Sequence, residues 1–133
     1  MSSEIEDAVR KLAVEVLDSF EKLEALLFIA ASSDPCPIEA VVSATGLDRK
    51  VLVDVLADLV SRSLLVVSAD SYSLAADGPW SAHVRALVQL HRSDRILVVT
   101  IMSQAAVKRL RLRAERAFAD AFVIRSRKGD HDR

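Results

Sequence analysis

One stretch constrains the fold of this chain more than any other: PIEAVVSATGLDRKVLVDVLADLVSRSLLVV, residues 37–67. Pro37 suits the first turn of a helix, where a missing N–H costs nothing. Gly46 supplies the left-handed conformation that ends a helix sharply, and Asp48 then caps a second helix that is predicted to reach about Ser61. The core side of this second helix is formed by Leu52, Leu56 and Leu59. The pattern therefore predicts two helices joined by a tight turn.

A small β-hairpin is predicted directly after the second helix. Residues 64–67 and 72–75 are two short apolar runs, and the four residues between them, Ser-Ala-Asp-Ser, favour a turn. The hairpin tip contains Asp70 but neither arginine nor lysine.

Amphipathic helices are predicted on both sides of this central unit. Residues 4–16 carry apolar side chains at helical spacing, and a further helix begins near Asp18 or Ser19 and ends at SSDPCP, where the prolines prevent continuation. After Asp77-Gly78-Pro79 the helical signal returns, and it is strong over residues 103–122. Residues 95–102 fit either a helix or a strand, with the helix favoured.

The composition indicates a mainly α-helical chain with few long loops, because its 133 residues include only three glycines and three prolines. The longest strongly apolar run, ILVVTIM at 96–102, is too short to cross a bilayer, so we expect no membrane partner. The start MSSEIEDAV lacks the basic-then-apolar order of a signal peptide. Together with the single cysteine, Cys36, these features favour a cytoplasmic protein.

Residues that carry chemistry are scarce in this sequence. His83, His91 and His131 have no metal-ligand spacing, and no cysteine or carboxylate cluster joins them. There is no nucleophile elbow, no Gly-rich phosphate loop and no pair of catalytic carboxylates. We therefore expect no enzyme activity, no cofactor and no metal site.

The net charge of −1 hides a strong asymmetry along the chain. Residues 18–79 hold ten acidic and four basic side chains, a net charge of −6, whereas residues 80–133 hold five acidic and twelve basic ones, a net charge of +7. Such a division favours either a nucleic-acid surface on the basic part or docking of basic parts on acidic ones.

The central unit resembles the winged helix-turn-helix domain of bacterial transcription regulators of the broad MarR-like kind. The resemblance covers about residues 19–76 and rests on IEAVVSATGLDRKVLVDVLADLVSRSLLVV. Gly46-Leu47 matches the turn, Asp48 replaces the usual Ser or Thr cap, and Ser63 replaces the usual Gly before two leucines. RAFADAFVIR, residues 116–125, is similar to the C-terminal tail of small uncharacterised bacterial helix-turn-helix proteins.

The sequence patterns and the resemblance together predict four segments. They are an N-terminal helical extension at 1–17, a winged helix-turn-helix domain at 18–77, a C-terminal helical region for dimerisation or interaction at 78–125, and a disordered tail at 126–133.

The function that the resemblance implies first is a transcription regulator that binds duplex DNA as a homodimer. Arg49 and Lys50 would contact the duplex at the start of the recognition helix, and the basic run KRLRLRAER at 108–116 adds further cations. The candidate DNA-binding residues are Arg49, Lys50, Lys108, Arg109, Arg113 and Arg116.

The acidic side chains of the same helix favour an alternative, in which the domain is a protein-interaction module that serves the transcription machinery. Asp54 and Asp58 lie one turn apart, next to Val53 and Ala57, and would repel phosphates but suit a protein partner with a basic patch. The candidate protein-interaction residues are Val53, Asp54, Ala57, Asp58 and Leu112. The sequence leaves both functions open.

A homodimer is expected in either case, through the amphipathic segments 4–16 and 95–122. The candidate dimerisation residues are Ile96, Val99, Met102, Val107, Leu110, Phe118 and Phe122. So much apolar surface, beside a domain with its own core, is unusual unless another surface covers it.

Overall fold

The computed structural model describes residues 2–131 and, within that range, the side chains of residues 4–122. This part of the chain is mainly helical, with six helices and one small antiparallel sheet of three strands. The helices are α1 (Ser2–Glu15), α2 (Phe20–Ala31), α3 (Ile38–Thr45), α4 (Arg49–Ser61), α5 (Ser81–Ser93) and α6 (Arg95–His131), and the strands are β1 (Cys36–Pro37), β2 (Leu65–Ser68) and β3 (Ser71–Leu74). The predicted mainly α-helical class is confirmed, as is a short β-hairpin.

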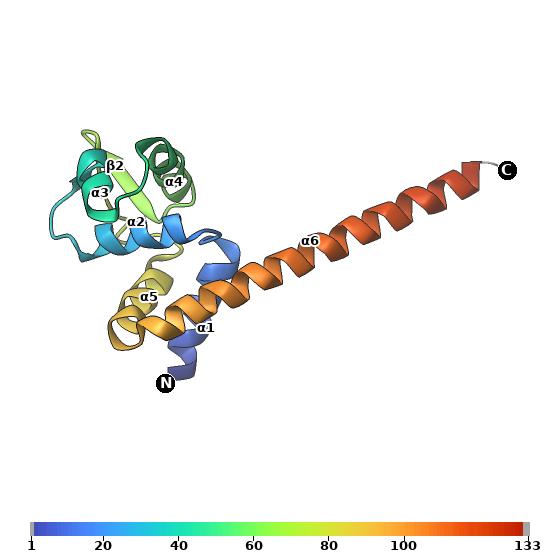
Figure 1. Cartoon of the computed structure of the whole chain (residues 1–133), viewed down its shortest axis with the longest axis horizontal. Coiled ribbons are helices and arrows are strands. Elements are labelled where there is room, and N and C mark those ends of the chain that lie inside the picture. The colour runs from blue at the N-terminus through green and yellow to red at the C-terminus, as the bar shows by residue number, and fades with distance from the viewer. Residues whose placement is uncertain (1, 132–133) are drawn as a thin grey trace.

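The helices form two groups that share one core. Helices α1, α5 and α6 pack against one another, while α2, α3 and α4 pack together and carry the sheet. Figure 1 shows α6 beginning beside α1 and α5 and then leaving the globular body as a single projecting helix.

Local capping interactions set the helix ends that the sequence predicts. The Ser19 hydroxyl accepts the backbone N–H of Lys22 at the start of α2, and the Asp48 carboxylate accepts the N–H of Lys50 at the start of α4. Gly46 ends α3 with a φ of 72°, in the left-handed region that glycine adopts without steric cost.

The sheet has the strand order β1-β3-β2, and both pairings are antiparallel. Ala69 and Asp70, both with positive φ, form the tight turn of the β2–β3 hairpin. The sequence did not predict β1, which pairs Cys36 with Tyr72 and Pro37 with Ser71. A two-residue strand has no periodicity to detect, and its proline is tolerated only because the strand lies at the edge of the sheet.

The apolar stripe of α1 is buried within this chain and is not a free surface. Val9, Leu12 and Ala13 are almost fully buried, and α1 packs against α5 and α6. The sequence predicted residues 4–16 as a dimerisation segment, because an amphipathic pattern shows that one face is covered but not by what. Here α5 and α6 cover it.

Helix α6 has two parts with different surroundings. Its first turns bury Val98, Ile101, Met102 and Ala105 in the core, which agrees with the favoured helix over residues 95–102. From Leu110 to Phe122 every side chain is exposed. The helix continues to His131 although the sequence predicted a disordered tail from 126, and residues 132 and 133 of that tail lie outside the described residues.

Ser63, which follows α4, and Gly78, which precedes α5, lie in close contact. Ser63 has a φ of 67° and donates its N–H to the Val60 carbonyl, so a serine occupies the left-handed position that ends the helix. A Cβ added to Gly78 would lie 2.6 Å from the Ser63 carbonyl oxygen, so only glycine fits there.

Candidate interaction surfaces

Helix α4 presents one side to solvent, which we call the α4 face: Lys50, Val53, Asp54 and Ala57. All four are exposed, and the opposite side of the helix buries Leu52, Leu56 and Leu59 in the core. The face is formed because residues four apart in a helix lie on the same side. It combines one cation, one carboxylate and an apolar centre, and Val53 has 48% of its surface exposed.

Arg49, a candidate DNA-binding residue, is paired within the chain. Its guanidinium donates to the Glu39 carboxylate of α3 at 2.7 Å, and both side chains remain mostly exposed. A hydrogen bond from the backbone N–H of Glu39, followed by the contact with Arg49, lowers the pKa of Glu39 below its ordinary value. Arg49 would have to leave or share this exposed ion pair to contact a phosphate.

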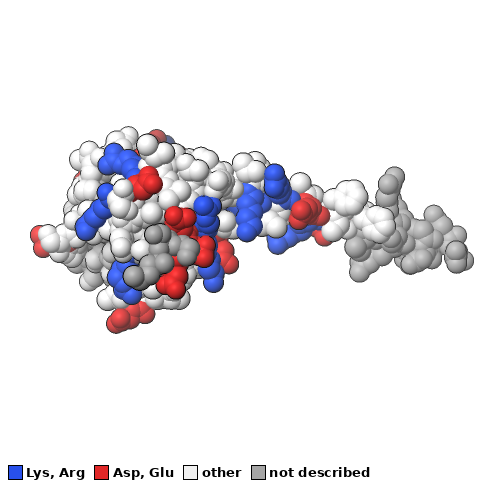
Figure 2. Space-filling view, turned by 90° about the horizontal axis from the view of Figure 1, so that it is seen from below, with Lys and Arg blue, Asp and Glu red and all other residues white. Residues whose placement is uncertain are grey.

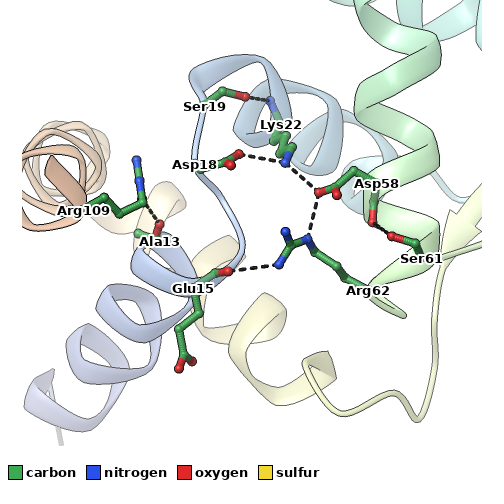
Figure 3. Close-up of polar contacts among 9 residues, drawn as sticks. All are labelled: Ala13, Glu15, Asp18, Ser19, Lys22, Asp58, Ser61, Arg62 and Arg109. Carbon is green, nitrogen blue, oxygen red and sulfur yellow. Dashed lines mark hydrogen bonds and ion pairs between the residues drawn. The ribbon is translucent and has the colours of Figure 1, made fainter. Parts of the chain in front are cut away.

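Asp58 belongs to an ion-pair cluster that joins α4 to α2 (Figure 3). Its carboxylate lies 2.6 Å from the Lys22 ammonium and 2.9 Å from the Arg62 guanidinium, and Lys22 also contacts Asp18 at 2.7 Å. Only 30% of the Asp58 side chain is exposed. Asp58 therefore does not share the solvent-facing role of Asp54, although the sequence placed both on one stripe.

The pKa values of this cluster shift in the directions that ion pairing requires. Burial alone would raise the pKa of Asp58, but Lys22 and Arg62 hold it below its ordinary value. Burial alone would lower the pKa of Lys22, but hydrogen bonds to Asp18 and Asp58 raise it above its ordinary value. Both groups are therefore held in their charged forms.

Two arginines satisfy the last carbonyl groups of α1. Arg62 donates to the Glu15 carbonyl at 3.2 Å, and Arg109 of α6 donates to the Ala13 carbonyl at 2.6 Å. Cations are favoured at a helix C-terminus, where carbonyls lack partners within the helix. Arg109, another candidate DNA-binding residue, is half-buried, and its guanidinium is hydrogen-bonded within the chain. Figure 3 shows both arginines reaching α1, from different sides.

The β2–β3 hairpin lies next to the α4 face and is itself partly apolar. Val66 and Val67 are each 48% exposed, and the tip residue Asp70 is exposed. A groove of about 510 Å³ runs between α4 and the hairpin, with Val53 and Asp70 among its lining residues. The hairpin therefore extends the apolar and acidic character of the α4 face.

The projecting part of α6 carries both cations and apolar side chains. Lys108, Arg113 and Arg116 are exposed, and Figure 2 shows positive side chains gathered on the part of the helix next to the globular body. Six of the seven candidate dimerisation residues are also exposed: Ile96, Val99, Val107, Leu110, Phe118 and Phe122. The seventh, Met102, lies in the core of this chain and is unavailable to a partner. Leu112 is exposed as well, on a different side of the helix from Leu110.

Sequence reasoning missed the partners of these candidate residues. Glu39, Lys22 and Arg62 were not singled out. The Arg49–Glu39 and Lys22–Asp58 pairs join separate helices and leave no pattern in a sequence, whereas the spacing of four residues between Asp58 and Arg62 is a signal that could have indicated their pair. Sequence reasoning also missed a cavity of about 680 Å³, which is lined mainly by apolar side chains of α2, α5 and the hairpin region, with Arg85 and Arg92 from α5. The two arginines lie seven residues apart on one side of α5.

Neither a membrane-spanning helix nor a metal-binding cluster occurs in the part of residues 2–131 that the structure describes. No helix in this range is long and apolar enough to span a membrane. Residues 4–122, whose side chains the structure describes, contain no group of three or more His, Cys, Asp or Glu side chains placed to hold a metal ion. Comparison of the chain with protein-family models, with curated proteins and with solved structures gave no match.

Proposed function

We propose that this chain is a winged-helix protein-interaction module, an adaptor of the bacterial transcription machinery. The order α2-β1-α3-α4-β2-β3 supports the winged helix, because that fold places a helix-turn-helix between a short strand and a hairpin. Helix α4 then occupies the position of the recognition helix, and the β2–β3 hairpin occupies the position of the wing.

The observation that carries this proposal is the chemistry of the α4 face and the hairpin beside it. Val53, Asp54 and Ala57 are exposed where a DNA reader needs donors and cations, Arg49 is paired with Glu39, and the hairpin ends in Asp70. Phosphate neutralisation supplies most of the sequence-independent affinity for DNA. Val53 and Ala57, with Asp54 and Asp70 beside them, instead match a protein partner that carries a basic patch.

The module is proposed to act as a homodimer. Leu110 and Phe118 are 63% and 75% exposed on the projecting part of α6, where no other element among the described residues covers them. A second copy is a suitable cover for such a stripe, because each copy leaves the same apolar area in water.

A second function is supported by a different observation. Lys50 lies exposed in the first turn of α4, and Lys108, Arg113 and Arg116 are exposed on α6. A helix N-terminus beside a lysine favours a phosphate. The second candidate is therefore a transcription regulator that binds duplex DNA through these cations.

Chemical crosslinking in cells tests the first proposal. The wild type is compared with a Val53→Glu, Asp54→Lys variant and with a control variant, Glu24→Lys, whose substitution is exposed on α2, outside the α4 face. A defined protein that crosslinks to the wild type and to the control, but not to the α4-face variant, agrees with the proposal. Crosslinks that are the same in all three proteins contradict it.

A further inference from the structure

Helix α6 carries two apolar stripes on opposite sides. The first, Val98, Ile101, Met102 and Ala105, is buried against the globular body. The second is exposed and consists of Ile96, Val99, Val107, Leu110, Phe118 and Phe122, with the smaller Ala114, Ala117 and Ala121 between them. At about 100° per residue the two stripes are centred roughly half a turn apart. We call the second one the outer stripe.

The outer stripe is long enough to hold another helix. From Ile96 to Phe122 it extends about 39 Å at 1.5 Å per residue. Val107, Leu110, Ala114, Ala117 and Ala121 alternate in steps of three and four, which is the seam spacing of a coiled coil. The alanines permit a close approach of two helices, and the large residues fill the space beside them.

The charges beside the outer stripe are unevenly distributed. Residues 108–113 contain Lys108, Arg109, Arg111 and Arg113 and no acid, whereas Glu115 and Asp120 lie further along. In Figure 2 the positive side chains of α6 lie next to the globular body, and a negative group follows further out along the helix. One copy of α6 therefore offers both a basic segment and, beyond it, carboxylates that a second copy can meet.

We propose that two copies of this chain pair through the outer stripes of α6 in an antiparallel orientation. This inference deepens the proposed homodimer and rests on it. With Ala114 opposite Ala117 of the partner, Leu110 lies opposite the partner's Ala121, and Arg113 lies beside the partner's Asp120. A two-fold axis produces each of these contacts twice.

The charge distribution selects this orientation over the parallel one. A parallel pair in register brings the two basic segments, residues 108–113, side by side. In the antiparallel pair each basic segment lies about ten residues away from its counterpart, or about 15 Å along the helix. That separation exceeds the Debye length of about 8 Å at physiological ionic strength, so the repulsion is largely screened. The Arg113–Asp120 contacts then add attraction at both ends of the seam.

Disulfide trapping between single-cysteine variants distinguishes the two orientations. Two variants, Leu110→Cys and Ala121→Cys, are prepared separately in a Cys36→Ala background. They are mixed, left until subunits have exchanged between the dimers, and then oxidised. The antiparallel pair gives a mixed 110–121 crosslink and little 110–110 crosslink, because its two residues 110 lie about 16 Å apart along the seam and a disulfide needs Cα atoms within about 7 Å. A dominant 110–110 crosslink overturns the inference.

A charge swap provides a second readout that needs no cysteine. Arg113→Glu and Asp120→Lys are each expected to weaken the dimer, on the order of fivefold, by placing like charges together. The double variant exchanges the two signs and is expected to restore wild-type dimerisation. Failure of the double variant to recover overturns the antiparallel register. A monomeric wild type at all concentrations overturns the homodimer as well, whereas loss of the α4-face partner alone leaves this inference intact.

Discussion

The ammonium of Lys22 lies 2.6 Å from the carboxylate of Asp58 and so joins α2 to α4. The spacing of Asp54 and Asp58 places both on one side of α4, yet only Asp54 faces solvent freely. Asp58 forms ion pairs within the chain, with Lys22 and Arg62. The acidic character of the α4 face therefore comes from Asp54, reinforced by Asp70 of the hairpin.

Asp58→Ala is expected to lower the free energy of unfolding by about 1–2 kcal/mol, because it leaves the partly buried Lys22 and the more exposed Arg62 without a shared partner. Asp54→Ala is the matched control, with the same substitution one turn earlier and an expected effect within about 0.5 kcal/mol. Urea unfolding followed by circular dichroism at equal protein concentration measures both. Equal losses in the two variants would show that the Asp58 cluster adds no stability.

The contribution of Asp58 to the free energy of unfolding is expected to depend on pH. Its folded-state pKa lies below the ordinary value of 3.8, so its stabilisation is present above that value and is lost as the pH falls through the folded-state pKa. The stability difference between the wild type and Asp58→Asn should be full near pH 6 and should shrink below about pH 4. Unfolding curves at pH 6 and at low pH test this, and a difference that stays constant would contradict it.

Ser63→Gly is expected to stabilise the protein by about 0.5–1 kcal/mol, because serine holds a left-handed conformation there that glycine adopts without a steric cost. Thermal unfolding measures the gain. Ser61→Gly is a control inside α4, and it should destabilise the helix instead. A loss of stability in Ser63→Gly would mean that the entropy of the unfolded chain outweighs the relief of strain.

Leu110→Glu combined with Phe118→Glu is expected to weaken the dimer at least about tenfold, because two charged side chains would be buried in the seam. Leu112→Glu is the control, since Leu112 is exposed but lies away from the outer stripe. Light scattering over a range of concentrations reports the mass of each variant. A dimer that survives the double substitution would place the interface elsewhere.

Local signals account for the parts of the fold that the sequence predicts well. Ser19, Asp48 and Gly46 set helix ends through contacts with residues no more than four positions away, so the pattern of neighbours is sufficient. The hairpin turn at Ala69 and Asp70 is equally local. Strand β1 has no such signal, because its pairing with β3 depends on residues more than thirty positions away.

Long-range contacts explain what the sequence did not predict at the candidate surfaces. The amphipathic pattern of α1 shows a buried face, but only the packed structure shows α5 and α6 against it. Asp58 differs from Asp54 because about 40° of further rotation around α4 brings its side chain to Lys22. The sequence predicts that Arg49 and Arg109 are available to DNA, yet each donates a hydrogen bond to another helix.

Titration of labelled duplex DNA at low salt tests the central claim, that the α4 face binds protein and not phosphate, most directly. Lys50→Ala should leave any weak retention of DNA by the wild type unchanged, while Asp54→Lys with Ala57→Lys should create salt-dependent binding. Tight binding by the wild type, with a log–log salt slope that falls by about 0.9 in Lys50→Ala, would contradict the claim and establish α4 as a DNA-reading helix.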